Sequence, residues 1–290
     1  MISSNLTNMK KALLIASILL LVALSWVIIA CSPKAQEPQT FTCGDVFTDD
    51  RDGNTYHTVL IGGQCWMCEN LKYLPSVSPI SERSPLRLWR SAAIESRTKP
   101  YYYVYGYQGR RVSEAKATAN YQNYGVLYNW PAAMGGACPT GWHVPSDAEW
   151  TQLADYLVDK YELGNDWVSV NGVGNALKSC RQVDSPLGGA CNTSEHPRWD
   201  SNDTPPPERK SVSVNVGEHY GSDEFGFSAL PGGRYAYGSF TEMGFHGFWW
   251  SSTEYYTTRA WYRFMRHEFG DVTRSNFDKV AGLSVRCVRD

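Results

Sequence analysis

The clearest hydrophobic pattern in the chain lies between residues 146 and 161, where apolar side chains recur at helical spacing. Four of them follow the spacing i, i+3, i+4 and i+7 and therefore share one helix face: Trp150, Leu153, Ala154 and Leu157. Ser146 and Glu149 form an S-x-x-E capping box, in which each side chain accepts a hydrogen bond from the backbone amide of the other residue. The pattern predicts a framework helix that begins after Ser146 and ends near Tyr161.

The rest of the chain shows short apolar runs separated by glycines and Asn/Ser/Thr turns. Thr55–Ile61 is the clearest strand, and Tyr101–Tyr105 is either an edge strand or an exposed binding loop, of which we favour the strand. A weaker helix is expected over Gly174–Ser179, an irregular insertion over Asp184–Arg209, and several short strands joined by glycine turns over residues 225–290. This pattern predicts a loop-rich α+β fold with short antiparallel strands.

The first thirty residues are typical of an export signal. Lys10 and Lys11 precede an apolar run from Ala12 to Ala30, which stops at Cys31. The junction Ile-Ile-Ala-Cys resembles a bacterial lipobox, whose cysteine is lipidated and becomes the new N-terminus. A plain signal anchor is the alternative, since the run is close to the roughly 20 residues that a membrane-spanning helix needs. Because a Ser-Pro pair ends the run directly after the cysteine, we favour the lipoprotein.

This interpretation divides the chain into three parts. Residues 1–30 are a lipoprotein signal peptide, residues 31–42 are a short polar tether, and residues 43–290 are the mature domain. More than one acyl chain on Cys31 gives durable anchoring, since a single chain holds only marginally. We therefore expect a bacterial membrane-anchored lipoprotein at the outer membrane or cell surface.

The net charge and the cysteines narrow the possibilities further. A formal net charge of −2 provides no long-range field to attract nucleic acid, so no nucleic-acid partner is expected. Seven cysteines follow Cys31, and in an exported protein they are disulfide candidates whose connectivity cannot be deduced from spacing. Cys180 and Cys191 flank a short loop with proline and glycines and could close it. The six cysteines assigned to disulfides are Cys43, Cys65, Cys138, Cys180, Cys191 and Cys287, which leaves Cys68 over.

Three motifs that could indicate chemistry are better explained as structure. Cys65–Cys68 has the spacing of a redox or zinc half-site, but a second half-site of matching spacing is missing. Asp50–Asn54 is similar to the opening of a calcium loop, but no acidic residue follows at the distance that would close it, so we expect a turn. His143 belongs to no triad-like set in the sequence, so we expect a structural histidine. We expect no metal, no cofactor and no catalytic residue.

Eight short motifs, taken as a set, carry a family resemblance. In chain order they are D-G-N-T-Y from Asp52, I-G-G-Q-C-W-M from Ile61, E-N-L from Glu69, Y-G-V-L-Y-N-W from Tyr124, C-P-T-G-W-H-V-P from Cys138, G-F-S-A-L-P-G-G from Gly226, W-S-S-T from Trp250 and S-V-R-C-V-R from Ser284. The set resembles the Fibrobacter succinogenes major paralogous domain over roughly residues 43–290. Members of this family are exported, often lipid-anchored bacterial proteins without an established activity. The resemblance implies a C-type lectin-like fold, in which the N- and C-terminal parts pair, and a disulfide between Cys138 and Cys287.

The tail, about residues 234–282, departs from this family frame in a structured way. Relatives commonly carry Asn where this chain carries aromatic or small polar residues. Each of those residues can be reached from an Asn codon by changing only its two adenines. Lys, Glu, Met and Trp cannot be reached in this way, and in the tail they stand only at other positions. This pattern resembles the adenine-directed mutagenesis of a diversity-generating retroelement, whose variable proteins display a C-type lectin-like surface.

These features predict a surface-displayed protein that binds an unknown protein or glycan ligand through a diversified face. Aromatic side chains offer contact area at low entropic cost, and small polar ones offer adaptable hydrogen bonds. We expect Trp249, Trp250, Trp261 and Cys287 to lie beneath this face. The candidate ligand-binding residues are Tyr237, Phe245, His246, Phe248, Tyr255, Tyr256, Arg259, Phe264, Arg266, His267, Phe269, Phe277 and Asp278.

Two other classes of function stay open at this point. The first is a non-diversified module that binds carbohydrate or protein and whose tail aromatics pack a core. A calcium-dependent sugar site is disfavoured, because the proline tripeptide that such a site needs is missing from the domain. The second is an enzyme similar to the formylglycine-generating group, which needs reactive paired cysteines. Cys287 lies in a basic run, but the resemblance makes it a disulfide partner.

Overall fold

Helix α5 (Asp147–Tyr161) begins at the capping box that the sequence predicts. Ser146 Oγ accepts a hydrogen bond from the Glu149 amide at 3.2 Å, and Glu149 Oε2 accepts one from the Ser146 amide at 2.7 Å. Trp150, Leu153, Ala154 and Leu157 are all buried, so the predicted apolar face is the packed face. The predicted framework helix is confirmed.

The computed structural model describes residues 41–80, 96–179, 199 and 221–290, and Thr42–Asp290 folds as one unit. The predicted signal peptide, Cys31, the loop from Cys180 to Cys191 and most of the predicted insertion lie outside the described residues. Within the described part of the chain, no helix is both long enough and apolar enough to cross a membrane.

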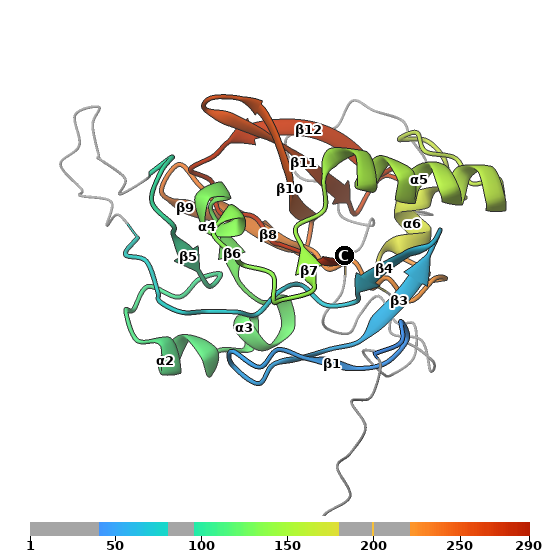
Figure 1. Cartoon of the computed structure of the whole chain (residues 1–290). Helices are drawn as coiled ribbons and strands as arrows, with labels where there is room; N and C mark the ends of the chain where they lie inside the picture. Colours follow the sequence, from blue (N-terminus) through green and yellow to red (C-terminus); the bar gives the residue numbers. More distant parts are fainter. Residues whose placement is uncertain (1–40, 81–95, 180–198, 200–220) are drawn as a thin grey trace, which may run out of the picture. The chain divides into compact units, whose positions relative to one another are not determined.

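The C-terminal tail forms a five-stranded sheet with the strand order β12-β11-β10-β8-β9 (Figure 1). Strand β10 pairs antiparallel with β11 and parallel with β8, while β11–β12 and β8–β9 are antiparallel. The strands are β8 (Gly232–Ala236), β9 (Ser239–Met243), β10 (His246–Tyr256), β11 (Arg259–Arg266) and β12 (Thr273–Asp278). Every candidate ligand-binding residue lies on one of these strands or on a turn that connects two of them.

A four-stranded sheet with the order β3-β4-β13-β7 joins the two ends of the domain. Val288 pairs with Trp66 on one side and with His143 on the other. The strands are β3 (Thr58–Ile61), β4 (Gln64–Met67), β7 (Trp142–His143) and β13 (Val288–Arg289). The pairing of N- and C-terminal parts that the resemblance implied is therefore present.

Two disulfides hold this sheet to its surroundings. Cys43 is bonded to Cys65, and Cys138 is bonded to Cys287 across 149 residues of sequence. The second bridge is the one that the family resemblance implied. Cys68 is free and buried among the described cysteines, in agreement with its assignment as the leftover.

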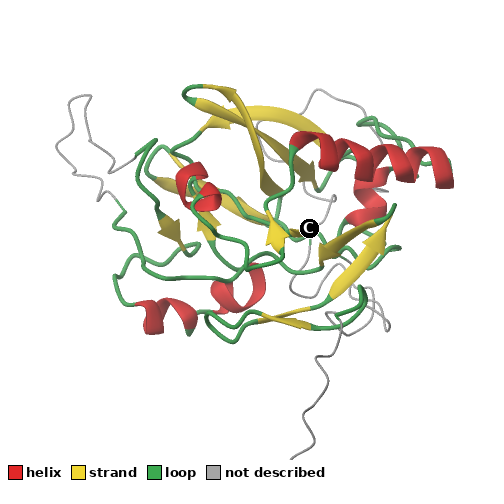
Figure 2. Ribbon diagram, viewed as in Figure 1, coloured by secondary structure: helices red, strands yellow, loops and turns green. Residues whose placement is uncertain are grey.

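The other elements are short and surround the two sheets (Figure 2). They are β1 (Phe47–Thr48), β2 (Thr55–Tyr56), β5 (Tyr102–Tyr103), β6 (Leu127–Tyr128), α2 (Val112–Lys116), α3 (Ala119–Tyr124), α4 (Trp130–Met134) and α6 (Val173–Leu177). The predicted strand Thr55–Ile61 is split between β2 and β3, and the tyrosine run from Tyr101 forms only the two-residue strand β5. The α+β class is confirmed: the sheets are mostly antiparallel and the helices few.

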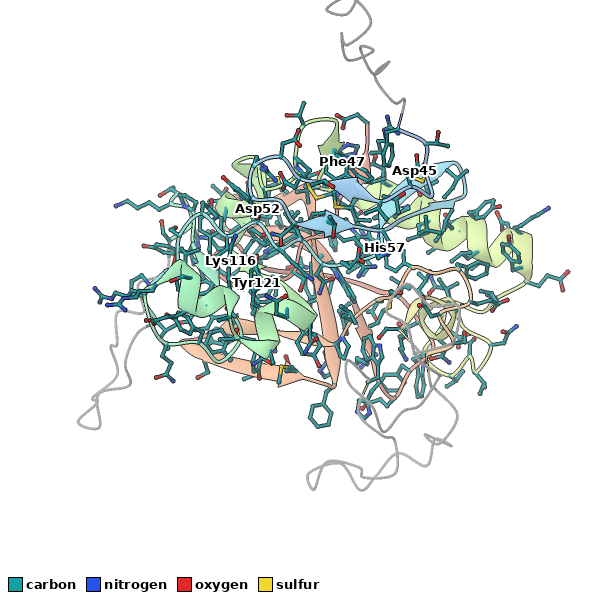
Figure 3. The ribbon with its side chains drawn as sticks, turned by 90° about the horizontal axis from the view of Figure 1, so that it is seen from below. Asp45, Phe47, Asp52, His57, Lys116 and Tyr121 are labelled. Atoms are coloured by element: carbon teal, nitrogen blue, oxygen red, sulfur yellow. A yellow bond between two sulfur atoms is a disulfide. The ribbon has the colours of Figure 1, made fainter. Side chains whose placement is uncertain are left out.

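The segment that is similar to a calcium loop is a turn next to β1 and β2. The side chain of Asp52 accepts hydrogen bonds from the amide and side chain of Asn54, at 3.1 and 2.6 Å, which is an Asx-turn. Lys116 Nζ lies 3.7 Å from Asp52 Oδ2, and Figure 3 shows Asp52, Lys116 and Tyr121 close together on the underside. Among the described residues, no cluster of three or more His, Cys, Asp or Glu side chains could hold a metal ion.

Aromatic side chains from distant segments form the main core. The Trp150 ring on α5 lies between Trp66 on β4, at 4.9 Å, and Trp249 on β10, at 6.2 Å between ring centroids. All three side chains are fully buried. Tilted contacts between aromatic rings stabilise a core by more than the burial of their apolar area alone. Helix α5 therefore holds the tail sheet against the four-stranded sheet that contains β4, which we call the N-terminal sheet.

Candidate binding face

The tail sheet has one side packed on α5 and one side turned away from it. Side chains alternate between the two sides of a strand. Trp249 and Met265 point into the core around α5, and Arg263 donates to the backbone carbonyl and a carboxylate oxygen of Asp147, at 2.8 and 2.9 Å. Phe248 and Phe264, which are directly paired across β10 and β11, therefore point to the opposite side.

On that opposite side, aromatic rings and guanidinium groups contact one another in a continuous network. Neighbouring ring centroids lie 5.5–6.1 Å apart, and two arginines lie over rings at 3.9–5.4 Å. We call this network the aromatic face; its members are Arg234, Tyr237, His246, Phe248, Tyr262, Phe264, Arg266, Phe269 and Phe277. Seven of these nine residues are among the ligand-binding candidates that the sequence predicts, and the other two are Arg234 and Tyr262.

The sheet curls toward the aromatic face. Arg234 on β8 lies 4.9 Å from the ring of Phe277 on β12, although β10 and β11 separate the two strands. Neighbouring strands are about 4.8 Å apart, so a flat sheet would hold these side chains too far apart to touch. The curl brings Arg234 of β8 and Phe277 of β12 to one surface.

The aromatic face is layered, which corrects the prediction that all of its members are exposed. Tyr237 is 80% exposed, and Phe264, Phe269 and Phe277 are half-buried, whereas Phe248 is only 4% exposed. Phe248 lies at the centre of the network, beside its cross-strand neighbour Phe264 and under the Arg234 guanidinium, and so forms its floor. Sequence gave no signal for this position, because burial here depends on the contact with Arg234 of β8.

His267 was also predicted to be exposed, and it is buried with 4% of its surface accessible. Its ring packs edge-on against the ring of Phe245, which is itself exposed, and its Nε2 lies 2.6 Å from Glu268 Oε2. The hydrogen bond from His267 lowers the pKa of Glu268. His267 therefore supports the rim of the face from below.

A second group of candidates lies at the β10–β11 hairpin, away from the aromatic face. Tyr255 packs on Tyr256 at 4.2 Å and on Trp261 at 4.6 Å between ring centroids. Trp261 was predicted to lie beneath the face, but it is half-buried on the other side of the sheet, with Arg274 stacked 3.5 Å from its ring centroid. The register of β11 is regular here, so Trp261 lies on the opposite side of the sheet from Tyr262 by the two-residue alternation of a strand, and the register shifts between Trp250 and Tyr256 are confined to β10.

Arg259 and Asp278 belong to the same hairpin group. The two residues are paired across β11 and β12. Arg259 donates a hydrogen bond to Asn276 Oδ1 at 2.9 Å, and Asp278 forms an ion pair with Arg97 at 2.6 Å. The thirteen candidates therefore form two surfaces rather than one, and the aromatic face is the larger.

The electrostatics of the aromatic face are set by arginine. Arg234 pairs with Glu242 at 2.7 Å, and Arg266 lies 3.9 Å from the ring centroid of Phe269. Burial lowers the pKa of His246 to about 4, so this imidazole is neutral at neutral pH. The face thus combines apolar rings with guanidinium groups that stack on them, a combination that is common in interface hot spots.

A separate cavity of about 290 Å³ lies between α4 and β7. It contains none of the candidate ligand-binding residues. Its lining residues are Ala133, Met134, Gly136, Ala137, Cys138, Trp142, His143, Val144 and Ser252. The ring nitrogens of His143 are committed: they lie 2.8 Å from Glu149 Oε1 and 2.6 Å from Asp290 Oδ1, which fits the predicted structural role.

The sequence profile of the Fibrobacter succinogenes major domain matches residues 59–289 of the chain. The chain belongs to this family. Comparison with curated proteins and with solved structures gave no match.

The motifs shared with the Fibrobacter succinogenes major domain meet beneath the tail sheet. Asn70 Oδ1 accepts hydrogen bonds from the indole Nε1 of Trp249 at 2.8 Å and from Arg286 Nη2 at 3.2 Å, and Arg286 also donates to the carbonyls of Phe227 and Ser228. All five residues are buried. The family motifs therefore form a buried frame, and the candidate residues lie on the sheet that this frame supports.

Sequence reasoning missed Arg234 and Tyr262 as members of the aromatic face. Tyr262 is two residues from Phe264 and four from Arg266, so the two-residue alternation of a strand could have found it. Arg234 follows the Gly-Gly pair that ends a family motif, and nothing in its local sequence indicates the contact with Phe277. That contact depends on the curl of the sheet.

Proposed function

We propose that this protein is a surface-displayed lipoprotein that binds a protein or glycan ligand through the aromatic face of its C-terminal sheet. In this proposal the domain has a C-type lectin-like fold, and the tail is the variable region of a diversity-generating retroelement. The chain is anchored to a bacterial membrane through a lipid on Cys31, with the domain at the outer membrane or cell surface. The protein is a binder rather than an enzyme.

The observation that carries the proposal is the aromatic face itself. Aromatic rings contact one another across β10, β11 and β12 on the side of the sheet that is turned away from α5: Phe248 and Tyr262 are buried, and the rings that contact them, Phe264 and Phe277, are half-buried. Contiguous apolar surface of this kind usually marks an interaction site in a soluble domain. Phenylalanine, tyrosine and arginine are also residue types in which binding energy concentrates.

The arrangement of layers also supports diversification. A random substitution at a buried position commonly costs about 1–5 kcal/mol, a large part of the stability of a domain. In this domain Asn70, Phe227, Ser228 and Arg286 of the buried frame belong to family motifs, whereas Tyr237, Phe264 and Phe277 lie on the sheet that this frame supports. Side chains at the upper positions can therefore change with little effect on the frame.

One observation favours the alternative function, a binding module that is not diversified. Phe248 and His267 are candidate variable positions, and both are buried. The discriminating observation is genomic. Retroelement diversification requires a near-copy of the tail's DNA, adenine-rich at the variable codons, beside a reverse transcriptase gene.

The enzyme alternative needs two reactive thiols. Cys287 is bonded to Cys138, and burial raises the pKa of Cys68 to about 12, which suppresses its thiolate. Thiol titration of the unreduced, denatured protein tests this directly. Two free thiols in the domain would revive the enzyme, and a single one supports the binder.

The binding proposal can be tested with a matched pair of triple variants. The first carries Phe264→Ser, Phe269→Ser and Phe277→Ser on the aromatic face. The control carries Val46→Ser, Leu60→Ser and Tyr161→Ser, which removes exposed apolar side chains elsewhere on the domain. Both are screened with the unmodified chain on arrays of defined glycans and of purified cell-surface proteins. Ligands held by the unmodified chain and the control should be lost from the face variant, and equal binding by all three would contradict the proposal.

A further inference from the structure

Two turns frame the candidate binding residues of the tail. One is the turn of residues 267–272, which connects β11 to β12 and carries Phe269. The other is the hairpin turn at Thr257 and Thr258, which connects β10 to β11. Both turns lie at the ends of the strands that carry the aromatic face and the hairpin group. A fully buried lysine contacts the first turn and a nearly buried lysine contacts the second.

Lys178 holds the first turn from below. Its side chain is fully buried, and its ammonium group donates to the backbone carbonyl of Phe269 at 2.6 Å and to Asn175 Oδ1 at 2.9 Å. The same ammonium lies 5.3 Å from the ring centroid of Trp199. An ammonium in the interior is costly unless it is hydrogen-bonded, and Lys178 is placed so that a carbonyl of the turn helps to satisfy it.

Two further contacts from the framework go to the backbone of this turn, beside the side-chain contact of the Phe269 ring with Trp167, at 5.7 Å between ring centroids. Gly174 donates its amide to the Gly270 carbonyl at 2.6 Å, and the Val272 amide donates to Asn165 Oδ1 at 3.0 Å. A Cβ atom on Gly174 would lie 2.3 Å from the carbonyl oxygen of Asp271, so this close approach requires glycine. Three framework residues, Lys178, Gly174 and Asn165, thus hold the turn through main-chain atoms, which do not depend on the side chains of the turn.

Lys279 holds the second turn in the same way. Only 5% of its surface is exposed, and Nζ donates to the Thr257 carbonyl at 3.1 Å. Its backbone amide donates to the Thr258 carbonyl at 3.0 Å, and its ammonium lies 4.3 Å from the ring centroid of Trp130. Glu254 provides an ion pair at 2.8 Å.

We propose that Lys178 and Lys279 are positioning residues that hold the two turns of the candidate binding surface by main-chain carbonyls, so that the turns keep their shape whichever side chains they carry. The proposal rests on the proposed function, because a fixed backbone under changeable side chains is useful only on a variable surface. Lysine codons cannot be reached from Asn codons by changing the two adenines, so mutagenesis of that kind does not generate these lysines, and Lys279 stands in the tail as part of its frame.

Amide hydrogen exchange of the full chain in detergent micelles, followed by mass spectrometry, tests the proposal without any ligand. Lys178→Met removes the ammonium while keeping an unbranched side chain, and amides of residues 267–272 should then exchange about tenfold faster or more. Amides of the hairpin turn and of α5 should keep their rates. Lys279→Met should give the reverse pattern. Lys160→Met, on the exposed side of α5, is the matched control and should change neither turn.

A second pair of variants tests whether the side chains of the turns matter. Phe269→Ser and Thr257→Ala keep the carbonyls and should leave exchange in both turns unchanged. Faster exchange throughout the domain in the lysine variants, no change in either turn, or faster exchange after Phe269→Ser would each overturn the proposal. If Lys178→Met does not fold, Phe269→Ser and Lys279→Met still decide the outcome. Because no ligand is involved, failure of the aromatic face to bind would contradict the proposed function and leave the exchange result intact.

Discussion

Trp249 donates its indole N–H to the side-chain oxygen of Asn70, a residue that precedes it by 179 positions, with 2.8 Å between Nε1 and Oδ1. The same oxygen accepts from Arg286 at 3.2 Å. One amide oxygen thus links the segment after β4 to Trp249 of the tail sheet and to the segment before β13.

Loss of this oxygen should destabilise the whole domain. Asn70→Leu leaves the buried indole and guanidinium without this acceptor, and an unsatisfied buried donor costs about 1–3 kcal/mol. We expect the free energy of unfolding to fall by at least about 2 kcal/mol in urea melts. Asn276→Ala, in the hairpin group, should change it by less than about 0.5 kcal/mol. Similar values for the two variants would show that the link is unimportant.

The helix α5 offers a graded test of the framework. Ser146→Ala removes a side-chain acceptor of the capping box and should cost about 1 kcal/mol. Trp150→Ala removes a ring that packs on Trp66, Phe227 and Trp249, and should cost roughly 3–5 kcal/mol. Both values come from denaturant melts of the full chain, and near-zero effects would argue against a packed helix.

The stability of the protein should depend on pH through Lys178. Burial lowers the pKa of this ammonium to about 7. The negative charges of Asp271 and Glu268 act in the opposite direction and raise the pKa, and the positive charge of Arg266 lowers it. The unfolded chain then binds more protons than the folded chain between pH 7 and the ordinary lysine pKa of about 10.4, so this group makes stability rise with pH across that window. Unfolding free energies measured from pH 6 to 9 should rise more in the unmodified protein than in Lys178→Met. Parallel curves would contradict the assignment.

Substitutions on the aromatic face should separate its surface from its floor. Tyr237→Ser, Phe264→Ser and Phe277→Ser together should lower Tm by no more than about 4 °C, because these side chains are exposed or half-buried. Phe248→Ala alone should cost about 3–5 kcal/mol, which is roughly 6–20 °C in a domain of this size. Calorimetry of both variants measures the contrast. A large fall in the triple variant would mean that the domain depends on these rings for its core.

Lipid attachment at Cys31 predicts a simple labelling result. Metabolic labelling with an acyl-chain analogue should mark the unmodified chain, and Cys31→Ser should abolish the label and leave the chain unanchored or unprocessed. Cys68→Ser should leave the label unchanged, since that thiol is buried in the domain. Persistent labelling of Cys31→Ser would refute the lipoprotein.

The parts of the structure that the sequence predicted correctly rest on local signals. The Ser146 cap and the apolar face of α5 lie within fifteen residues of one another, so helical spacing was sufficient. The bridge from Cys138 to Cys287 came from the family resemblance, since no local pattern specifies a partner 149 residues away.

The parts that were missed depend on how distant strands meet. Phe248 is buried because its cross-strand neighbour Phe264 stacks on its ring and Arg234 of β8 lies over it. Trp261 lies on the other side by the ordinary alternation of β11 with Tyr262 and Phe264, whereas a one-residue register shift in β10 places Tyr256 opposite Arg259. Two-residue alternation could have separated Trp261 from Phe264, but the register shift at Tyr256 and the contact of Arg234 with Phe248 leave no mark in hydrophobic periodicity. A single face was therefore predicted, and two surfaces are found.

The position of β13 makes the fold of the domain depend on a tail that is translated in frame to its end. Val288 fills the place between β4 and β7, and Cys287 closes the bridge to Cys138, so the N-terminal sheet cannot be completed until residues 287–289 have been made correctly. A frameshift or stop codon anywhere in the tail would remove this strand and leave two strands unpaired and one cysteine without its partner. Substitutions within the tail spare them. Under the proposed function, a fold of this kind would accept altered side chains in the tail and would fail to form in chains whose reading frame is altered.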